Sequence, residues 1–179
     1  MTRGRKRATG LAVAVMAAGA LGCGGGGPEG DGVGRNVLHI AIGNDPASLD
    51  PIQAVDVNRG RLVAYMYDGL VQFRADEVEP NLATSWEISE DGTVYTFHLR
   101  DDVRFHNGRR MTADDVRWSF ERALTPASAS PLTWVFEFIE GAEAMVEGQA
   151  GSLSGLRVVD PTTVEITLRE PFAPFLKLM

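Results

Sequence analysis

Two short runs of alternating apolar residues, joined by Asp91-Gly92, constrain the fold of this 179-residue chain more than any other feature. The apolar members are Trp86 and Ile88 before the turn, and Tyr95, Phe97 and Leu99 after it. An Asp-Gly pair between two runs of period two is a strong signal for a β-hairpin with one buried face. We therefore expect a sheet whose inner face is covered by other elements of the chain.

The sequence from residue 37 to residue 179 is expected to add strands and helices to this hairpin, giving a mixed α and β (α/β) domain. The clearest helix begins at Thr112, has Asp115 in the position of a capping-box acid and ends at Pro126. Four other elements are expected: a buried strand at 37–42, a helix whose apolar residues run from Leu62 to Leu70 with Gly69 near its end, a helix at 134–147, and a strand at 163–169. Residues 171–179 resemble the start of an apolar helix, so the chain is expected to stop in the middle of an element.

The first 22 residues have the pattern of a secretory signal peptide. Four basic residues precede an apolar run from Leu11 to Leu21, and no acidic residue lies among the 22. A basic start followed by about 7–15 apolar residues is typical of such leaders. The run is too short for a transmembrane helix, which needs about 20 apolar residues.

Cys23, the only cysteine, lies at the end of this leader. Ala20-Leu21-Gly22-Cys23 resembles a bacterial lipobox, in which the cysteine is lipidated, although Ala20 stands where the usual pattern has Leu. The alternative is a conventional cleavage at Ala18-Gly19-Ala20, with Cys23 merely nearby. Residues 23–36 are rich in glycine and predict a flexible tether. The predicted organisation is a signal peptide at 1–22, a tether at 23–36 and a body at 37–179.

The charge balance excludes some classes of function. The whole chain has a formal charge of −7, and removal of the leader with its four basic residues would move this to −11. Such acidity argues against a protein that binds nucleic acid. A single cysteine also excludes an intrachain disulfide framework and a site with several thiolate ligands.

No group of residues in the sequence has the spacing of a catalytic or metal site. The three histidines, His39, His98 and His106, belong to no HExxH or Cys/His motif. The acidic pairs Asp101-Asp102 and Asp114-Asp115 are typical of a turn and of a helix start. No Gly-x-Ser-x-Gly motif is present. The sequence therefore predicts neither an enzyme nor a protein with a metal or cofactor.

A series of short strings, in order and at matching spacing over residues 37–179, resembles one family. They are Ser48–Pro51, Tyr67–Leu70, Glu79–Ala83, Ser85–Glu87, Asp91–Thr93, Tyr95–Arg100, Val103–Gly108, Thr112–Val116, Ser119-Phe120 and Pro171-Phe172. In this order the strings resemble the peptide-type extracellular solute-binding proteins, family 5, of bacterial ABC importers.

The resemblance implies a type II, Venus-flytrap binding protein that captures extended peptides or similar small solutes outside the membrane. It would pass them to permease subunits and be held at the cell envelope membrane by the lipid on Cys23. In the family, the loop after the Leu-Asp-Pro string lines the cleft, which assigns ligand contacts to Val55, Asp56 and Val57. A second loop, Ser130–Leu132, also approaches the ligand in relatives, many of which have an aromatic residue at the position of Leu132.

Family members are roughly three times as long as this chain. The resemblance therefore implies that residues 37–179 supply only the N-terminal part of the first lobe, with the second lobe absent. A ligand is enclosed only when both walls of a cleft are present. The alternative function is that of a shortened surface lipoprotein that acts as a structural or interaction module without binding solute.

Overall fold

The alternating runs on either side of Asp91-Gly92 form the predicted antiparallel hairpin, β3 (Ala83–Ile88) and β4 (Val94–Leu99). The structure, a computed structural model, describes residues 39–75 and 77–179. Gly92 has φ of +73°, a left-handed conformation that glycine adopts without strain. The Asp91 carboxylate accepts a hydrogen bond from the backbone N–H of Thr93 at 3.1 Å. Local turn chemistry thus determines how the two strands pair.

The hairpin belongs to a four-stranded antiparallel sheet with the order β3-β4-β6-β5. β5 (Leu156–Asp160) and β6 (Thr163–Thr167) form a second hairpin around the predicted Asp160-Pro161 turn. The two edge strands each have a register shift, between Ala83 and Ser85 in β3 and between Val158 and Asp160 in β5. A separate two-stranded sheet, β1 (Val71–Arg74) and β2 (Glu77–Pro80), was not predicted.

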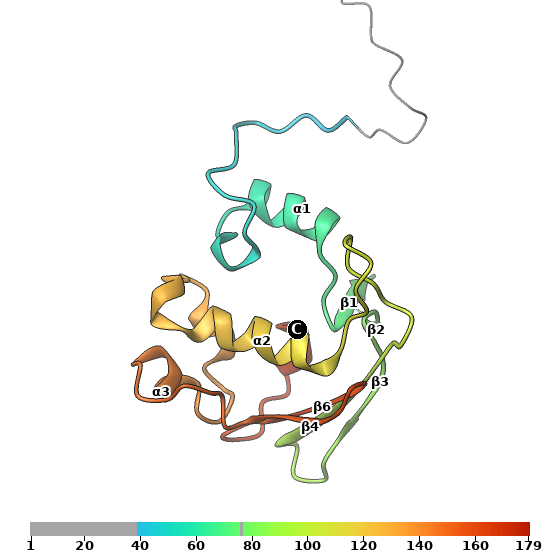
Figure 1. Cartoon of the computed structure of the whole chain (residues 1–179), viewed down its shortest axis with the longest axis vertical. Coiled ribbons are helices and arrows are strands. Elements are labelled where there is room, and N and C mark those ends of the chain that lie inside the picture. The colour runs from blue at the N-terminus through green and yellow to red at the C-terminus, as the bar shows by residue number, and fades with distance from the viewer. Residues whose placement is uncertain (1–38, 76) are drawn as a thin grey trace, which may run out of the picture. The chain divides into compact units, whose positions relative to one another are not determined.

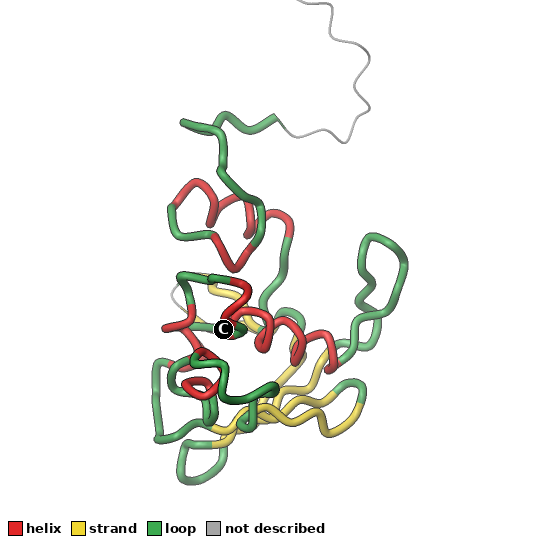
Figure 2. Tube along the Cα trace, turned by 60° about the vertical axis from the view of Figure 1, so that its left-hand side comes forward, coloured by secondary structure: helices red, strands yellow, loops and turns green. Residues whose placement is uncertain are grey.

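Helix α2 (Ala113–Leu124) lies over one face of the four-stranded sheet (Figures 1 and 2). It begins as predicted, because the Asp115 carboxylate accepts a hydrogen bond from the backbone N–H of Thr112 at 2.9 Å. Its inner stripe includes Val116 and Leu124, which are buried. The residues that share this core are Tyr95, Phe97 and Leu99 of β4, Val164 and Ile166 of β6, and Leu168 directly after β6. A fully buried side chain of this kind contributes about 1.5–3 kcal/mol on burial, so this layer is a substantial source of the fold's apolar stabilisation.

The predicted buried strand at 37–42 is wrong for the residues that the structure describes. Residues 39–42 are not part of a strand, and Ile40 and Ile42 are 44% and 37% exposed. A strand needs a neighbouring strand to receive its backbone hydrogen bonds, and none of the described strands pairs with this segment. Residues 37 and 38 lie outside the described residues.

The predicted helix at 62–70 is displaced toward the N-terminus. Helix α1 spans Val57–Met66 and ends at Tyr67, which is extended. Leu70 is a core residue just before β1 and is not on the helix. Gly69 lets its backbone lie close to that of Met179, because a Cβ at this position would be 2.7 Å from the Met179 carbonyl oxygen. The prediction that Gly69 ends the helix is therefore wrong, because α1 ends three residues earlier.

The single helix predicted at 134–147 is also wrong. The segment forms the 3-10 helix η3 (Thr133–Phe136), a turn, and the short helix α3 (Ala142–Val146). Ile139 is fully buried and forms an isolated β-bridge with Leu168, which takes the backbone out of helical geometry. Gly141 then has φ of +80°, outside the right-handed helical region.

The segment at 171–179 forms only the 3-10 helix η4 (Phe175–Lys177). The predicted start of an apolar helix is therefore shorter and tighter than expected. Phe175 is fully buried, and its ring centroid lies 4.8 Å from that of Tyr95. Packing of this one aromatic side chain against the sheet determines the path of the segment.

Candidate functional site

The Leu-Asp-Pro string anchors the segment before α1 onto the C-terminal end of α2. Asp50 caps the 3-10 helix η1 (Pro51–Gln53), where its carboxylate accepts a hydrogen bond from the backbone N–H of Ile52 at 3.3 Å. The same carboxylate pairs with Arg122 through two contacts, one of them 3.0 Å between Nη1 and Oδ1. The hydrogen bond from Arg122 holds the pKa of Asp50 below its ordinary value. An ion pair between residues 72 positions apart thus fixes where the next loop starts.

Hydrogen bonds then bring the two predicted ligand loops side by side. The chain leaves α2 through the 3-10 helix η2 (Pro126–Ser128). The Gln53 side-chain amide donates to the carbonyl of Ser128 at 3.1 Å. The Ser130 hydroxyl donates to the carbonyl of Ile52 at 2.8 Å. The 3-10 helix η1, which leads into loop 54–58, is therefore joined to the loop around Ser130, a link that sequence reasoning did not foresee.

The first predicted loop presents apolar side chains to solvent and uses its acid internally. Val55 and Val57 are 53% and 71% exposed. Asp56 is the N-cap of α1, and its carboxylate accepts hydrogen bonds from the backbone N–H of Arg59, at 3.0 Å, and from the Arg59 guanidinium. These bonds hold the pKa of Asp56 below its ordinary value. The side chain of Asp56 thus fixes the start of α1 while staying 45% exposed, and Val57 is the first residue of that helix.

The second predicted loop holds Leu132 half-buried. Its backbone N–H donates to the Ser130 hydroxyl oxygen at 3.2 Å. Two residues further on, Trp134 is the second residue of η3, and its side chain is 55% exposed. The sequence placed this aromatic residue within a helix and did not assign it to the site. Because many relatives have an aromatic residue at the position of Leu132, an aromatic residue close to it in sequence is the signal that could have drawn attention to Trp134.

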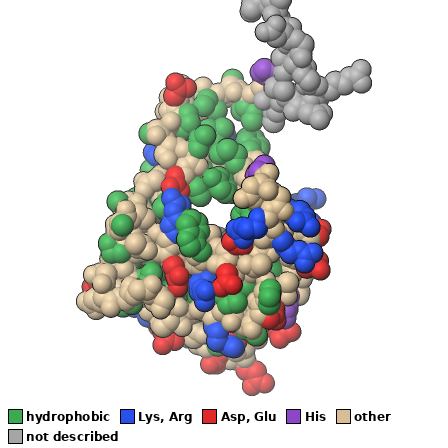
Figure 3. All heavy atoms as spheres, in the orientation of Figure 1, with side chains coloured by type: hydrophobic (Ala, Val, Ile, Leu, Met, Phe, Trp, Pro, Cys, Tyr) green, Lys and Arg blue, Asp and Glu red, His purple; other side chains and the backbone are tan. Residues whose placement is uncertain are grey.

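An apolar hollow of about 390 Å³ lies between the C-terminal end of α1, helix α2 and residues 103–106. Tyr67 and Phe105 line it with exposed rings, and Val116 and Phe120 line it from α2. Hydrophobic side chains also gather over α1 in the space-filling view (Figure 3). Helix α1 has no fully buried residue: Leu62 and Val63 are half-buried, and Val57, Tyr65 and Met66 are exposed.

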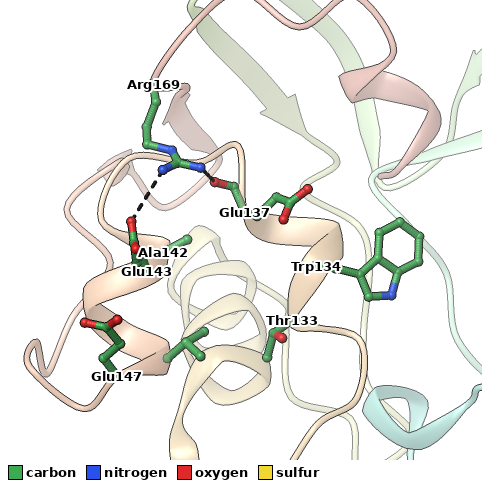
Figure 4. A pocket seen from close by; sticks show the side chains of 8 residues that line it. Thr133, Trp134, Glu137, Ala142, Glu143, Glu147 and Arg169 are labelled. Carbon is green, nitrogen blue, oxygen red and sulfur yellow. Dashed lines mark hydrogen bonds and ion pairs between the residues drawn. The ribbon is translucent and has the colours of Figure 1, made fainter.

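A second hollow, of about 370 Å³, is lined by three glutamates and Arg169 (Figure 4). Arg169 lies 3.6 Å from the Glu143 carboxylate and also donates a hydrogen bond to the carbonyl of Glu137. The Trp134 ring points away from Glu143 and Glu147 (Figure 4). The acidic groups therefore do not converge on one point together with the aromatic ring.

Within residues 39–75 and 77–179, no group of three or more His, Cys, Asp and Glu side chains is arranged to hold a metal ion. His98 lies 3.6 Å from Glu87 on the outer face of the hairpin. No helix in the described part of the chain has the length and hydropathy to cross a membrane. The predicted signal peptide, the predicted tether and Cys23 lie outside the described residues.

Comparison with known proteins gives consistent matches. A sequence profile described as "Bacterial extracellular solute-binding proteins, family 5 Middle" matches residues 77–179. The oligopeptide-binding protein OppA of Bacillus subtilis (strain 168) is 36% identical over 166 residues, which are 89% of this chain and 30% of that protein.

Solved structures match as well. The Escherichia coli murein tripeptide binding protein MppA superimposes with a TM-score of 0.70 at 34% identity, over 75% of this chain and 27% of that one. The Haemophilus influenzae OppA complex with the peptide RPPGFSPFR gives a TM-score of 0.70 at 28% identity, with the same coverage. The chain thus spans less than a third of the length of the relatives it matches.

Proposed function

Because this chain belongs to family 5 of the bacterial extracellular solute-binding proteins, we propose that it is part of the substrate-binding component of a peptide-type ABC importer. Its mixed helix and sheet fold corresponds to about a quarter of the type II fold of periplasmic peptide-binding proteins, as predicted. The observation that carries the proposal is the junction of the two loops, 54–58 and 130–132, by hydrogen bonds between η1 and the loop after α2.

The proposed ligand is an extended peptide or a similar small solute, captured outside the membrane. The relatives named above are an oligopeptide-binding protein and a murein tripeptide binding protein. An extended peptide binds largely through its backbone, as an added strand does, and needs a rigid neighbouring segment with exposed groups. Val55 lies on such a segment, between η1 and the capped start of α1, and Val57 is the first residue of that helix.

The proposed partners are the permease subunits of the importer and, through a lipid on Cys23, the cell envelope membrane. The leader at 1–22 and the tether at 23–36 support export and anchoring. We also propose that the chain has no enzymatic activity of its own and does not bind nucleic acid. Its acidic charge and the lack of a nucleophile–base motif in the sequence support both statements.

Joining this chain to the rest of a relative tests the proposed function. The part of Bacillus subtilis OppA beyond its match to this chain is fused after Met179, and tri-alanine binding is measured by calorimetry. We expect a dissociation constant between about 1 nM and 1 µM, because both walls of a cleft are then present. The unfused chain is the control and is expected to bind at least a thousandfold more weakly.

A fusion protein that unfolds cooperatively and yet gives no binding heat with tri-alanine, tetra-alanine or RPPGFSPFR would contradict the proposal. That result would favour the alternative, a structural or interaction module. Lipidation is tested separately by Cys23→Ser in the bacterial host. The variant is expected to lose the mass of the acyl chains and to leave the membrane fraction, and unchanged fractionation would overturn the anchoring proposal.

A further inference from the structure

We infer that Ser130 is a positioning residue whose hydroxyl sets the spacing between the two loops of the proposed site. The hydroxyl donates to the carbonyl of Ile52, in the segment that leads into loop 54–58, at 2.8 Å. Its oxygen accepts from the backbone N–H of Leu132 at 3.2 Å. One serine hydroxyl can donate once and accept as well, so a single atom ties the backbone of loop 130–132 to that of η1, which leads into loop 54–58.

The chain around Ser130 is shaped to bring this hydroxyl to Ile52. Ala129 has φ of +45°, a left-handed conformation that is uncommon for a residue with a Cβ. The Ser128 hydroxyl donates to the carbonyl of Thr125 at 2.7 Å and accepts from the backbone N–H of Ser130 at 3.3 Å. The reversal at Ala129 is thus held by hydrogen bonds on one side and by the contact of Ser130 with Ile52 on the other.

Few other forces fix the spacing of the two loops. Neither η1 nor α1 has a buried residue, so apolar packing contributes little to the position of loop 54–58. The other links across the junction are the Asp50–Arg122 pair and the Gln53 amide, and neither contacts Leu132. Ser130 is half-buried, and its hydrogen bond to Ile52 is partly shielded from water. Loss of its hydroxyl should therefore let Leu132 move relative to Val55 and Val57.

The consequence for binding rests on the proposed function. A ligand that contacts both loops loses affinity when their spacing is no longer set in advance, since binding must then also order the loops. A residue needed only for stability would lower the melting temperature and leave the coupling between the loops unchanged.

The test uses the isotope-labelled full chain, the variants Ser130→Ala and Ser130→Thr, and NMR. In Ser130→Ala, we expect amide exchange at Leu132 and over residues 54–58 to become about fivefold faster, the effect of losing one hydrogen bond. Ser130→Thr keeps the hydroxyl and should restore the slow exchange. The matched control is Ser119→Ala, because that hydroxyl bonds only to the Asp115 carbonyl within α2.

A calorimetric titration of the fusion protein with tri-alanine gives the second readout. In the Ser130→Ala fusion, the dissociation constant should rise about fivefold, and Ser130→Thr should restore it. Unchanged exchange at Leu132 and over residues 54–58 in the Ser130→Ala chain would overturn the role of Ser130. A wild-type fusion protein that gives no binding heat speaks against the proposed function, and the exchange rates of the chain still decide the role of Ser130.

Discussion

The four-stranded sheet with α2 and the segment from Ser48 to Met66 are stabilised in different ways. In the first region, side chains such as Phe97, Val164 and Ile166 are fully buried. In the second, η1 and α1 have no buried residue, and polar links such as the Asp50–Arg122 pair hold the segment in place. Burial thus defines the scaffold, whereas hydrogen bonds position the loops proposed to contact ligand. Such loops can change in sequence at little cost to the fold.

Removal of a core aromatic side chain should lower the free energy of unfolding more than any other change considered below. Phe97→Ala should lower the free energy of unfolding by about 3–5 kcal/mol, because the Phe97 ring is fully buried between Tyr95 and Trp86 and its removal leaves a cavity. Urea unfolding followed by circular dichroism measures the change. The control is Phe73→Ala, whose side chain is 50% exposed, with an expected effect below about 1 kcal/mol. If the two variants lose the same free energy of unfolding, burial does not determine how much each aromatic side chain contributes to stability.

Replacing a glycine with alanine should destabilise the protein in the sheet region and stabilise it in the segment from Ser48 to Met66. In Gly155→Ala, the new Cβ would lie 2.7 Å from the carbonyl oxygens of Glu140 and Thr167, so we expect a loss of about 1–3 kcal/mol in unfolding free energy. In Gly60→Ala, within α1, no atom lies within 4 Å of the new Cβ. Alanine favours a helix interior by up to about 1 kcal/mol over glycine, so amide protection of α1 should rise. A stabilised Gly155→Ala protein would show that the close packing around Gly155 can relax.

The start of α2 should make stability depend on pH. The hydrogen bond from Arg109, and that from the Thr112 backbone, hold the pKa of Asp115 below its ordinary value. As the pH falls through the ordinary aspartate pKa of about 3.9, the unfolded chain takes up the proton first, and stability is lost. Asp115→Asn should cost about 1 kcal/mol at pH 7 and progressively less at acidic pH.

Urea unfolding at pH 7 and at pH 3 measures this difference. The control is Asp114→Asn on the same helical turn, where the side chain is 64% exposed and pairs only with Arg117. A cost for Asp115→Asn that does not change with pH would mean that the carboxylate charge contributes nothing to the cap.

The smallest effect on global stability is expected for Arg122→Gln. The Asp50–Arg122 pair is partly exposed, and such pairs contribute about 0–1 kcal/mol. Amide exchange over residues 50–58 should nevertheless become faster, because this pair positions η1. Arg157→Gln, which removes the Arg157–Glu165 pair between β5 and β6, is the matched control and should leave those amides unchanged. If Arg122→Gln also leaves them unchanged, the polar links of the second region are redundant.

Sequence patterns predicted those parts of the fold that depend on local interactions. The turn at Asp91-Gly92 and the cap at Thr112 and Asp115 involve residues within a few positions of one another, and both were confirmed. The errors came from distant contacts. Burial of Ile139 against β6 breaks the expected helix at 134–147, and exposure of Ile42 follows from the lack of a neighbouring strand among the described residues. Periodicity alone cannot show such contacts.

The candidate site shows the same limit. Resemblance to the family selected Val55, Asp56, Val57 and Leu132, and their contact with ligand remains a prediction. Neither the cap made by Asp56 nor the contact of Ser130 with Ile52 was expected. The Ser130 contact joins residues 78 positions apart, which no local pattern can indicate.

The register shifts at the two ends of the sheet also bear on how the protein behaves at high concentration. An edge strand with a regular row of free N–H and C=O groups invites pairing with another molecule, which is a common route to aggregation. A bulge twists such a strand and interrupts that row. Because both β3 and β5 carry a register shift, each outer edge of the described four-stranded sheet is a poor template for pairing with a second copy.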